Sequence, residues 1–274
     1  MSRRIRFIPE GGALVEVTCR ALQSRLLFRP SPVLNQIIIG TLARAKKRHD
    51  KVRVCFFVGL SNHMHILLWV EDAQGLAKFM GYFQSKLARE VGRLTGWKEK
   101  IFGRRYHAIV VSDEEKAQVE RLRYCLAHGA KEDLVERPQD WPGVHSVRAL
   151  LEGESLEGLW FDRTQEYLAR RRGKTFDPLE YATREALELD PLPCWEHLTA
   201  EQRRARVAAL VADIESEIAA RRTRTGAKPL GVAAILAQNP LQRPKKTKKG
   251  IGVEPVLNLF SRALRPIQEA VTFP

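Results

Sequence analysis

The chain has 274 residues, 44% hydrophobic and 28% charged, a composition typical of a globular protein with enough apolar side chains for a sizeable core. Its 46 Lys and Arg residues outnumber its 32 Asp and Glu residues, and the formal charge of +14 indicates a polyanionic partner, nucleic acid ahead of an acidic membrane surface. The four scattered cysteines exclude a disulfide framework and zinc-finger spacing. No apolar run approaches the ~20 residues that span a bilayer. The N-terminal segment lacks the apolar core of a secretory signal, so we expect a cytoplasmic protein without a membrane partner.

Apolar periodicity divides the first half of the chain into short strands and longer helices. The predicted elements are a strand at 13–22, a helix at 30–50, strands at 52–60 and 63–70, a helix at 75–96, a strand at 106–112 and a helix at 113–129. The short polar break Ser61-Asn62 favours an antiparallel hairpin. Ser112 or Asp113 can cap the last helix, and Gly129 can end it.

This β-α-β-β-α-β order, followed by one more helix, predicts an α+β fold over roughly residues 12–130. It is the split βαβ, ferredoxin-like pattern, an antiparallel sheet with helices on one face. We place one domain at residues 1–150. Residues 151–274 are predicted to form a mostly helical, basic and partly flexible C-terminal extension.

The extension contains one long amphipathic helix at 199–222, with Thr199 as its N-cap and Arg203 where a capping box would favour Glu. Residues 221–250 carry nine Lys or Arg and no acidic residue, so this stretch can attract phosphates without reading bases.

His63 and His65 stand on an otherwise apolar strand and share one face, because side chains alternate along a strand. Two imidazoles placed about 6–7 Å apart along the strand can hold one ion, or they can be half-buried histidines with hydrogen-bond partners. The helix predicted at 113–129, after the fourth strand, carries Tyr124 and His128 one turn apart on one face. Tyr124 lies beside an apolar stripe, so this face should border the sheet.

The segments "NHMHILLWV", "RRYHAIVVSDEE" and "RLRYCLAHGAKEDLVERPQDWPGVHSV" resemble the single-tyrosine HUH transposases, and among them the REP-associated tyrosine transposases. The resemblance covers roughly residues 12–150 and implies that residues 1–150 form a transposase or nuclease domain. It implies His63 and His65 as metal ligands and Tyr124 as the nucleophile. The family usually has Asn or Gln as the third ligand, where this chain has His128. The resemblance implies Mg²⁺ or Mn²⁺, and three nitrogen ligands favour Mn²⁺.

The resulting hypothesis is a nucleoid-associated, metal-dependent endonuclease or transposase that cleaves and rejoins single-stranded or hairpin DNA through a 5′-phosphotyrosine. Whether it works as a monomer or a homodimer stays open. One alternative is a domesticated DNA-binding protein with altered catalysis, which His128 favours; another is a metal-dependent phosphoesterase. Residues expected to contact phosphates, or else to form a solvated basic face, are Arg104, Arg105, Arg121, Arg123, Lys245, Lys246, Lys248 and Lys249.

Overall fold

The structure, a computed structural model, describes residues 7–173 and 177–244. Its helices and strands, in chain order, are β1 (Ala13–Arg20), α1 (Pro32–Arg48), β2 (Val52–Leu60), β3 (His63–Val70), α2 (Ala73–Thr95), β4 (His107–Val110), α3 (Glu115–Leu126), α4 (Val147–Glu152), β5 (Leu156–Phe161), α5 (Arg163–Arg171), β6 (Ala182–Leu187), α6 (Ala200–Thr225) and α7 (Val232–Ala237). No helix in these described ranges is both long enough and apolar enough to cross a membrane.

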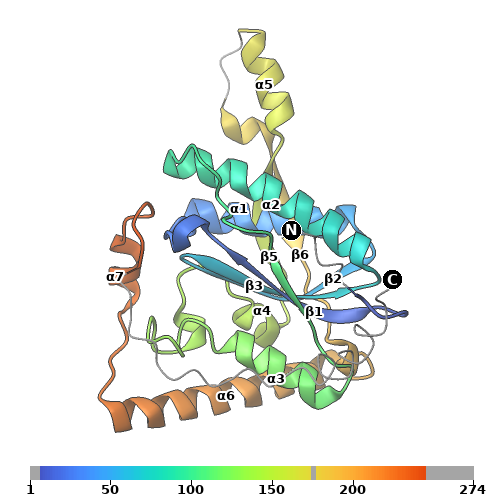
Figure 1. Ribbon diagram of the computed structural model, residues 1–274, viewed down its shortest axis with the longest axis vertical. Helices are drawn as coiled ribbons and strands as arrows, with labels where there is room; N and C mark the ends of the chain where they lie inside the picture. The colour runs from blue at the N-terminus through green and yellow to red at the C-terminus, as the bar shows by residue number, and fades with distance from the viewer. Residues whose placement is uncertain (1–6, 174–176, 245–274) are drawn as a thin grey trace, which may run out of the picture.

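The main sheet has the strand order β2-β3-β1-β4, and every neighbouring pair is antiparallel (Figure 1). This topology confirms the predicted α+β class and the split βαβ arrangement. Strands β2 and β3 form the predicted hairpin, with Leu60 paired with His63. Strand β3, which carries His63 and His65, therefore lies between two neighbours.

Helices cover both faces of the sheet, whereas the sequence pattern predicts them on one face only. Helices α1 and α2 bury apolar side chains of the first face, among them Val17 and Ile66. Helices α3 and α6 cover the second face and pack around Leu67 and Phe56 (Figure 1). The second layer forms because β1, β2 and β3 present apolar residues on both sides, so that neither face can be left in water.

The segment beyond residue 150 contains a two-stranded antiparallel sheet, β5 with β6, where the sequence pattern predicts helix. This hairpin lies against α1 at a point where two glycines remove side chains from the contact. A Cβ on Gly40 would lie 2.3 Å from the backbone of Leu159, and a Cβ on Gly158 would lie 2.3 Å from Gly40 N. The contact therefore depends on two glycines that allow backbones to touch.

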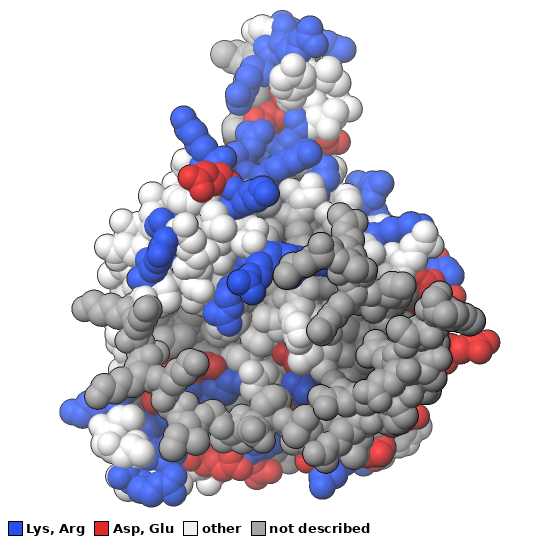
Figure 2. Space-filling view, in the orientation of Figure 1, with Lys and Arg blue, Asp and Glu red and all other residues white. Residues whose placement is uncertain are grey.

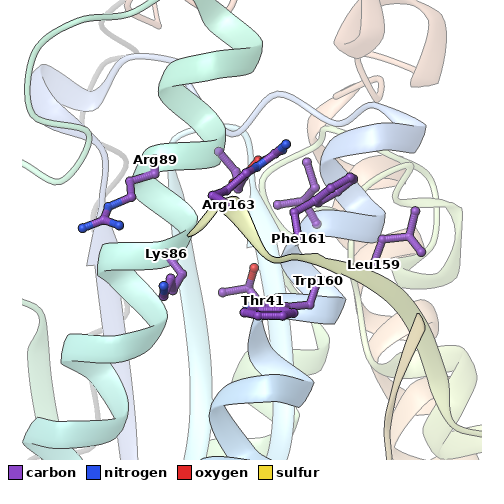
Figure 3. A pocket seen from close by; sticks show the side chains of 9 residues that line it. Thr41, Lys86, Arg89, Leu159, Trp160, Phe161 and Arg163 are labelled. Carbon is purple, nitrogen blue, oxygen red and sulfur yellow. The ribbon is translucent and has the colours of Figure 1, made fainter. Parts of the chain in front are cut away.

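Charged and aromatic side chains complete the contact between this hairpin and the two helices. Arg44 of α1 stacks on the ring of Trp160 at 4.4 Å and forms an ion pair with Glu185 at 2.7 Å. Figure 3 shows Trp160 close to Thr41, with Lys86 on the neighbouring helix α2. Helix α5 lies in the connection between β5 and β6 and projects away from the body of the protein (Figure 1).

The long helix α6 has the predicted N-cap, Thr199, but the capping-box partner is Gln202 and not Arg203. Thr199 Oγ1 accepts from Gln202 N at 3.2 Å, and Gln202 Oε1 accepts from Thr199 N at 2.8 Å.

At α3 the prediction of Ser112 or Asp113 as the cap is wrong: the helix begins later, at Glu115. Helix α6 packs on α3 and α4, so residues before and after position 150 contribute to the same apolar core on the second face of the sheet. The domain boundary at residue 150 stays a prediction.

Candidate metal and tyrosine site

The two histidines of β3 project from the second face of the sheet, the side covered by α3. His63 lies opposite Arg20, and His65 lies opposite Thr18 of β1. Their ring centroids are 5.1 Å apart, which is what two alternate residues of a strand produce. His65 is buried, while His63 keeps partial exposure at the end of the strand. The strand thus presents two imidazoles side by side beneath a helix.

Helix α3 brings the tyrosine and the third histidine over this pair. The helix docks through buried Leu122, Cys125 and Leu126, and this fixes the direction in which Tyr124 faces. The ring of Tyr124 lies 6.0 Å from that of His65. The helix ends at Leu126, so the prediction of a helix to residue 129 that carries His128 is wrong. His128 lies two residues beyond this end, its ring 5.0 Å from that of Tyr124 and stacked on His65 at 4.1 Å. The four rings predicted as a site are therefore neighbours.

One ring nitrogen each of His63, His65 and His128 lies within 4.8 Å of the others. This is close enough for the three imidazoles to hold one divalent ion with small side-chain adjustments. Three nitrogen donors suit Zn²⁺ well and are tolerated by Mn²⁺ more readily than by Mg²⁺, which prefers oxygen. The donor set therefore fits a divalent metal ion.

An oxygen acceptor engages the Nδ1 atom of each of these rings. Nδ1 of His65 donates to the carboxylate of Glu16 at 2.6 Å, and Nδ1 of His128 donates to Glu132 at 2.9 Å. Nδ1 of His63 lies 2.6 Å from the side-chain oxygen of Asn62. Because ionised carboxylates only accept hydrogen bonds, the rings of His65 and His128 carry their proton on Nδ1. Nε2 of each ring is then left as the ligand atom, the usual arrangement around metal-bound histidines.

Burial keeps two of the three ligands neutral, which is the form that binds metals. Burial, followed by the neighbouring His65, lowers the pKa of His63 to about 2. The pKa of His128 is well below its ordinary value for the same two reasons. Burial alone would raise the pKa of Glu16, but the hydrogen bond from His65 and the Arg121 guanidinium outweigh it and lower this pKa. Glu16 is therefore a carboxylate at neutral pH.

Tyr124 sits at the mouth of the site with 45% of its surface exposed. Burial of the remainder, followed by the charge of Glu16, raises the pKa of the phenol. In the metal-free protein Tyr124 is therefore a neutral phenol, and it needs additional positive charge nearby before it can ionise. The closest cation is Lys131, whose Nζ lies 3.3 Å from the centroid of the tyrosine ring.

Hydrogen bonds from helix α6 hold the turn that carries His128. Arg222 of α6 donates to the carbonyl oxygens of Ala130 at 2.9 Å and Val135 at 2.8 Å. Asp133 in the same turn accepts from Arg222 at 2.8 Å. Helix α6, beyond residue 150, therefore positions the third histidine through the turn that carries it.

The predicted phosphate contacts fall into three groups. Arg121 forms an ion pair with buried Glu16 at 2.8 Å, and Arg123 pairs with Glu217 of α6, so both have acidic partners. Arg104 and Arg105 are exposed in the loop before β4. The remaining four, Lys245, Lys246, Lys248 and Lys249, lie outside the described residues.

The residues that orient the site were not identified from the sequence. Glu16 is a charged residue in the middle of an apolar strand, and this unusual placement was the available signal. Glu132 stands four positions after His128, within reach of its ring, but such spacing is common. Lys131 gave no signal, because its role depends on the conformation of the turn after α3.

Comparison with known proteins gives similarity in structure only. No protein-family model matches the chain, and no curated protein matches it. A REP-associated tyrosine transposase bound to a REP hairpin is similar at 15% identity and a TM-score of 0.43, over 56% of this chain and 86% of that one. A protein from Deinococcus radiodurans R1, provisionally assigned as a transposase, is similar at 11% identity and a TM-score of 0.28, over 44% and 95%. Both of these proteins are described as transposases.

Proposed function

We propose that the protein is a metal-dependent endonuclease and strand transferase for single-stranded DNA, in which Tyr124 forms a covalent bond with a 5′-phosphate. The observation that carries this proposal is the convergence of Tyr124 with the three-histidine cluster, its ring 5.0 Å from that of His128. A solvent-accessible tyrosine beside neutral imidazoles is what a phosphotyrosine mechanism requires. The sequence resemblance and the charge of +14 support a DNA substrate.

The chemistry assigns one role to each group. The Tyr124 hydroxyl loses its proton as its oxygen attacks the phosphorus, the P–O3′ bond breaks, and the 3′-oxygen takes up a proton to leave as a 3′-hydroxyl. The phosphate keeps its bond to the 5′-oxygen of the DNA and is now also esterified to Tyr124. Because the new ester conserves the energy of the broken bond, a later 3′-hydroxyl can reverse the step and join strands. A divalent ion held by His63, His65 and His128 would polarise the phosphate and offset its negative charge. Glu16 and Glu132 hold two of these rings in the tautomer that leaves Nε2 available.

The proposal includes the finer features that the site suggests. Three nitrogen donors favour Mn²⁺ over Mg²⁺. Exposed Arg104 and Arg105 are the proposed phosphate contacts near the sheet, and the basic residues at 245–249 are proposed to add sequence-independent attraction. The substrate is proposed to be hairpin or repeat DNA, and the protein is proposed to associate with the nucleoid.

The test is to incubate the protein with labelled single-stranded hairpin oligonucleotides and Mn²⁺, and to look for a covalent protein–DNA band on a denaturing gel. We expect the band with wild type and none with Tyr124→Phe. Tyr167→Phe is a matched control, because Tyr167 is a 58% exposed tyrosine on α5 and outside the site. Absence of the band with wild type, or an equal band with Tyr124→Phe, would contradict the proposal.

A non-catalytic DNA-binding protein is the second candidate, and one observation favours it. Nε2 of His128 lies 3.2 Å from Nζ of Lys131, so the third ligand already has a partner in the metal-free protein. This candidate predicts DNA binding that neither a chelator nor Tyr124→Phe changes, and no covalent band.

A small-molecule phosphoesterase is less well supported, because it would need a carboxylate free to act as a base. Both oxygens of Glu16 are engaged, one by His65 and one by Arg121. Asp72, near the end of β3, caps α2 by accepting from Gly75 N at 2.6 Å.

A further inference from the structure

Lys131 occupies a position in which it contacts both the tyrosine and a proposed metal ligand. Its Nζ donates to the backbone oxygen of Tyr124 at 3.0 Å and lies 3.3 Å from the centre of the Tyr124 ring. The same Nζ is 3.2 Å from Nε2 of His128. The side chain is only 26% exposed, so it is held in the site and does not extend into solvent.

The contact with His128 excludes a metal from that ligand. Nδ1 of His128 carries the ring proton and donates it to Glu132 at 2.9 Å. A neutral imidazole then has one lone pair left, on Nε2, and this lone pair faces the lysine ammonium. A metal needs the same lone pair. Lys131 and a metal ion therefore cannot bind His128 at the same time.

A displaced Lys131 would remain close to the tyrosine. Its backbone N–H is fixed to the Ala127 carbonyl at 2.9 Å, and the turn around it is held by Arg222 of α6. The four-carbon side chain starting from this fixed point reaches Tyr124 already. An ammonium released from His128 thus has two acceptors within reach: the carboxylate of Glu132, whose Oε1 lies 3.9 Å from Nζ, and Tyr124 with any phosphate placed against it.

We propose that a divalent ion and Lys131 exchange at His128, and that the released ammonium neutralises negative charge at Tyr124 and the bound phosphate during strand cleavage. The second half of this proposal rests on the proposed function, whereas the first half concerns metal binding alone. Lys131 is thereby a competitor for the metal site before metal binds, and a source of positive charge beside the nucleophile afterwards.

The test compares Lys131→Met, which keeps the stem and removes the ammonium, with Lys116→Met. Lys116 is exposed on α3, the helix that precedes the turn of Lys131, so this control makes the same change in net charge outside the cluster. Titration with Mn²⁺ alone, followed by calorimetry, should show about fivefold tighter binding by Lys131→Met, the change expected on removing one competing hydrogen bond. Lys116→Met should bind Mn²⁺ like wild type. At saturating Mn²⁺, Lys131→Met should form the covalent DNA band about tenfold more slowly.

Each half of the proposal has its own contradicting result. Unchanged or weaker Mn²⁺ binding by Lys131→Met overturns the exchange, and an unchanged rate of band formation at saturating Mn²⁺ overturns the role at Tyr124. If circular dichroism shows that Lys131→Met does not fold, Lys131→Gln serves as a second variant, because it keeps an N–H donor but has no charge. Its Mn²⁺ affinity should lie between those of wild type and Lys131→Met. If wild type forms no covalent band, the proposed function fails, yet the Mn²⁺ titration still decides the exchange.

Discussion

Replacing Glu16 by Gln tests whether the buried carboxylate beneath the histidines prepares them for metal. Glu16 is only 3% exposed and accepts hydrogen bonds from His65 at 2.6 Å and Arg121 at 2.8 Å. Glutamine keeps the shape and one acceptor oxygen but loses the charge, and its NH₂ group, which only donates, cannot accept the hydrogen bond of the second partner. His65 would therefore lose the acceptor that fixes its tautomer, or Arg121 would lose its counter-charge.

The size of the effect follows from these two contacts. Losing the carboxylate that orients a metal-bound histidine weakens metal affinity about 10–100-fold, or about 1.4–2.8 kcal/mol. Hydrogen bonds to charged groups contribute about 1.5–3 kcal/mol each, and one of the two is lost in Glu16→Gln. We therefore expect the metal-free variant to be about 2–3 kcal/mol less stable, a decrease in Tm on the order of 5–10 °C for a chain of this length.

The assay combines Mn²⁺ titration of the full chain with thermal unfolding in the presence of a chelator. Glu185→Gln is the matched control, because Glu185 is also buried, at 6% exposure, and has two cationic partners, Arg44 and Lys47, on the hairpin side of the protein. Glu185→Gln should lower Tm without changing Mn²⁺ affinity. The reasoning is refuted if Glu16→Gln binds Mn²⁺ as wild type does, or if Glu185→Gln loses as much affinity.

Two further predictions concern packing and pH. Gly40→Ala should destabilise the protein by at least about 2 kcal/mol, because the new Cβ would meet the Leu159 backbone at 2.3 Å. Gly81→Ala, in open space on α2, should be neutral or slightly stabilising. Urea unfolding measures the stability of both variants, and equal stabilities would count against the close contact. Burial lowers the pKa of His63 to about 2 and that of His145 to about 4, from 6.5, so below pH ~6.5 the unfolded chain binds more protons than the folded one. The free energy of unfolding, measured with a chelator present, should therefore decrease as the pH falls from 7 to 5, and should continue to decrease until the pH reaches the lowered pKa values of the two histidines. A Tm that stays constant or rises between pH 7 and pH 5 would contradict this prediction.

The element order and the location of the candidate site followed from local patterns in the sequence. Alternation along residues 63–70 placed His63 and His65 on one face, a property of the isolated strand that holds whatever the rest of the chain does. The four-residue spacing predicted Tyr124 and His128 on one helix, but α3 ends at Leu126 and the turn after it brings His128 beside the tyrosine. The order of strands and helices then limited the topology to the split βαβ sheet that the structure has.

Contacts between distant segments were decided only by the tertiary structure. The β5–β6 hairpin forms because Gly40 and Gly158 let its backbone approach α1, a match that neither segment reveals alone. Glu16 meets His65 across a separation of 49 positions, as the strand register dictates. Lys131 meets His128 because a turn held by α6 points both side chains inward. The sequence by itself determined which groups could do the chemistry. Their hydrogen-bond partners, and hence their charge and availability, were determined by the packing of elements that are far apart in the chain.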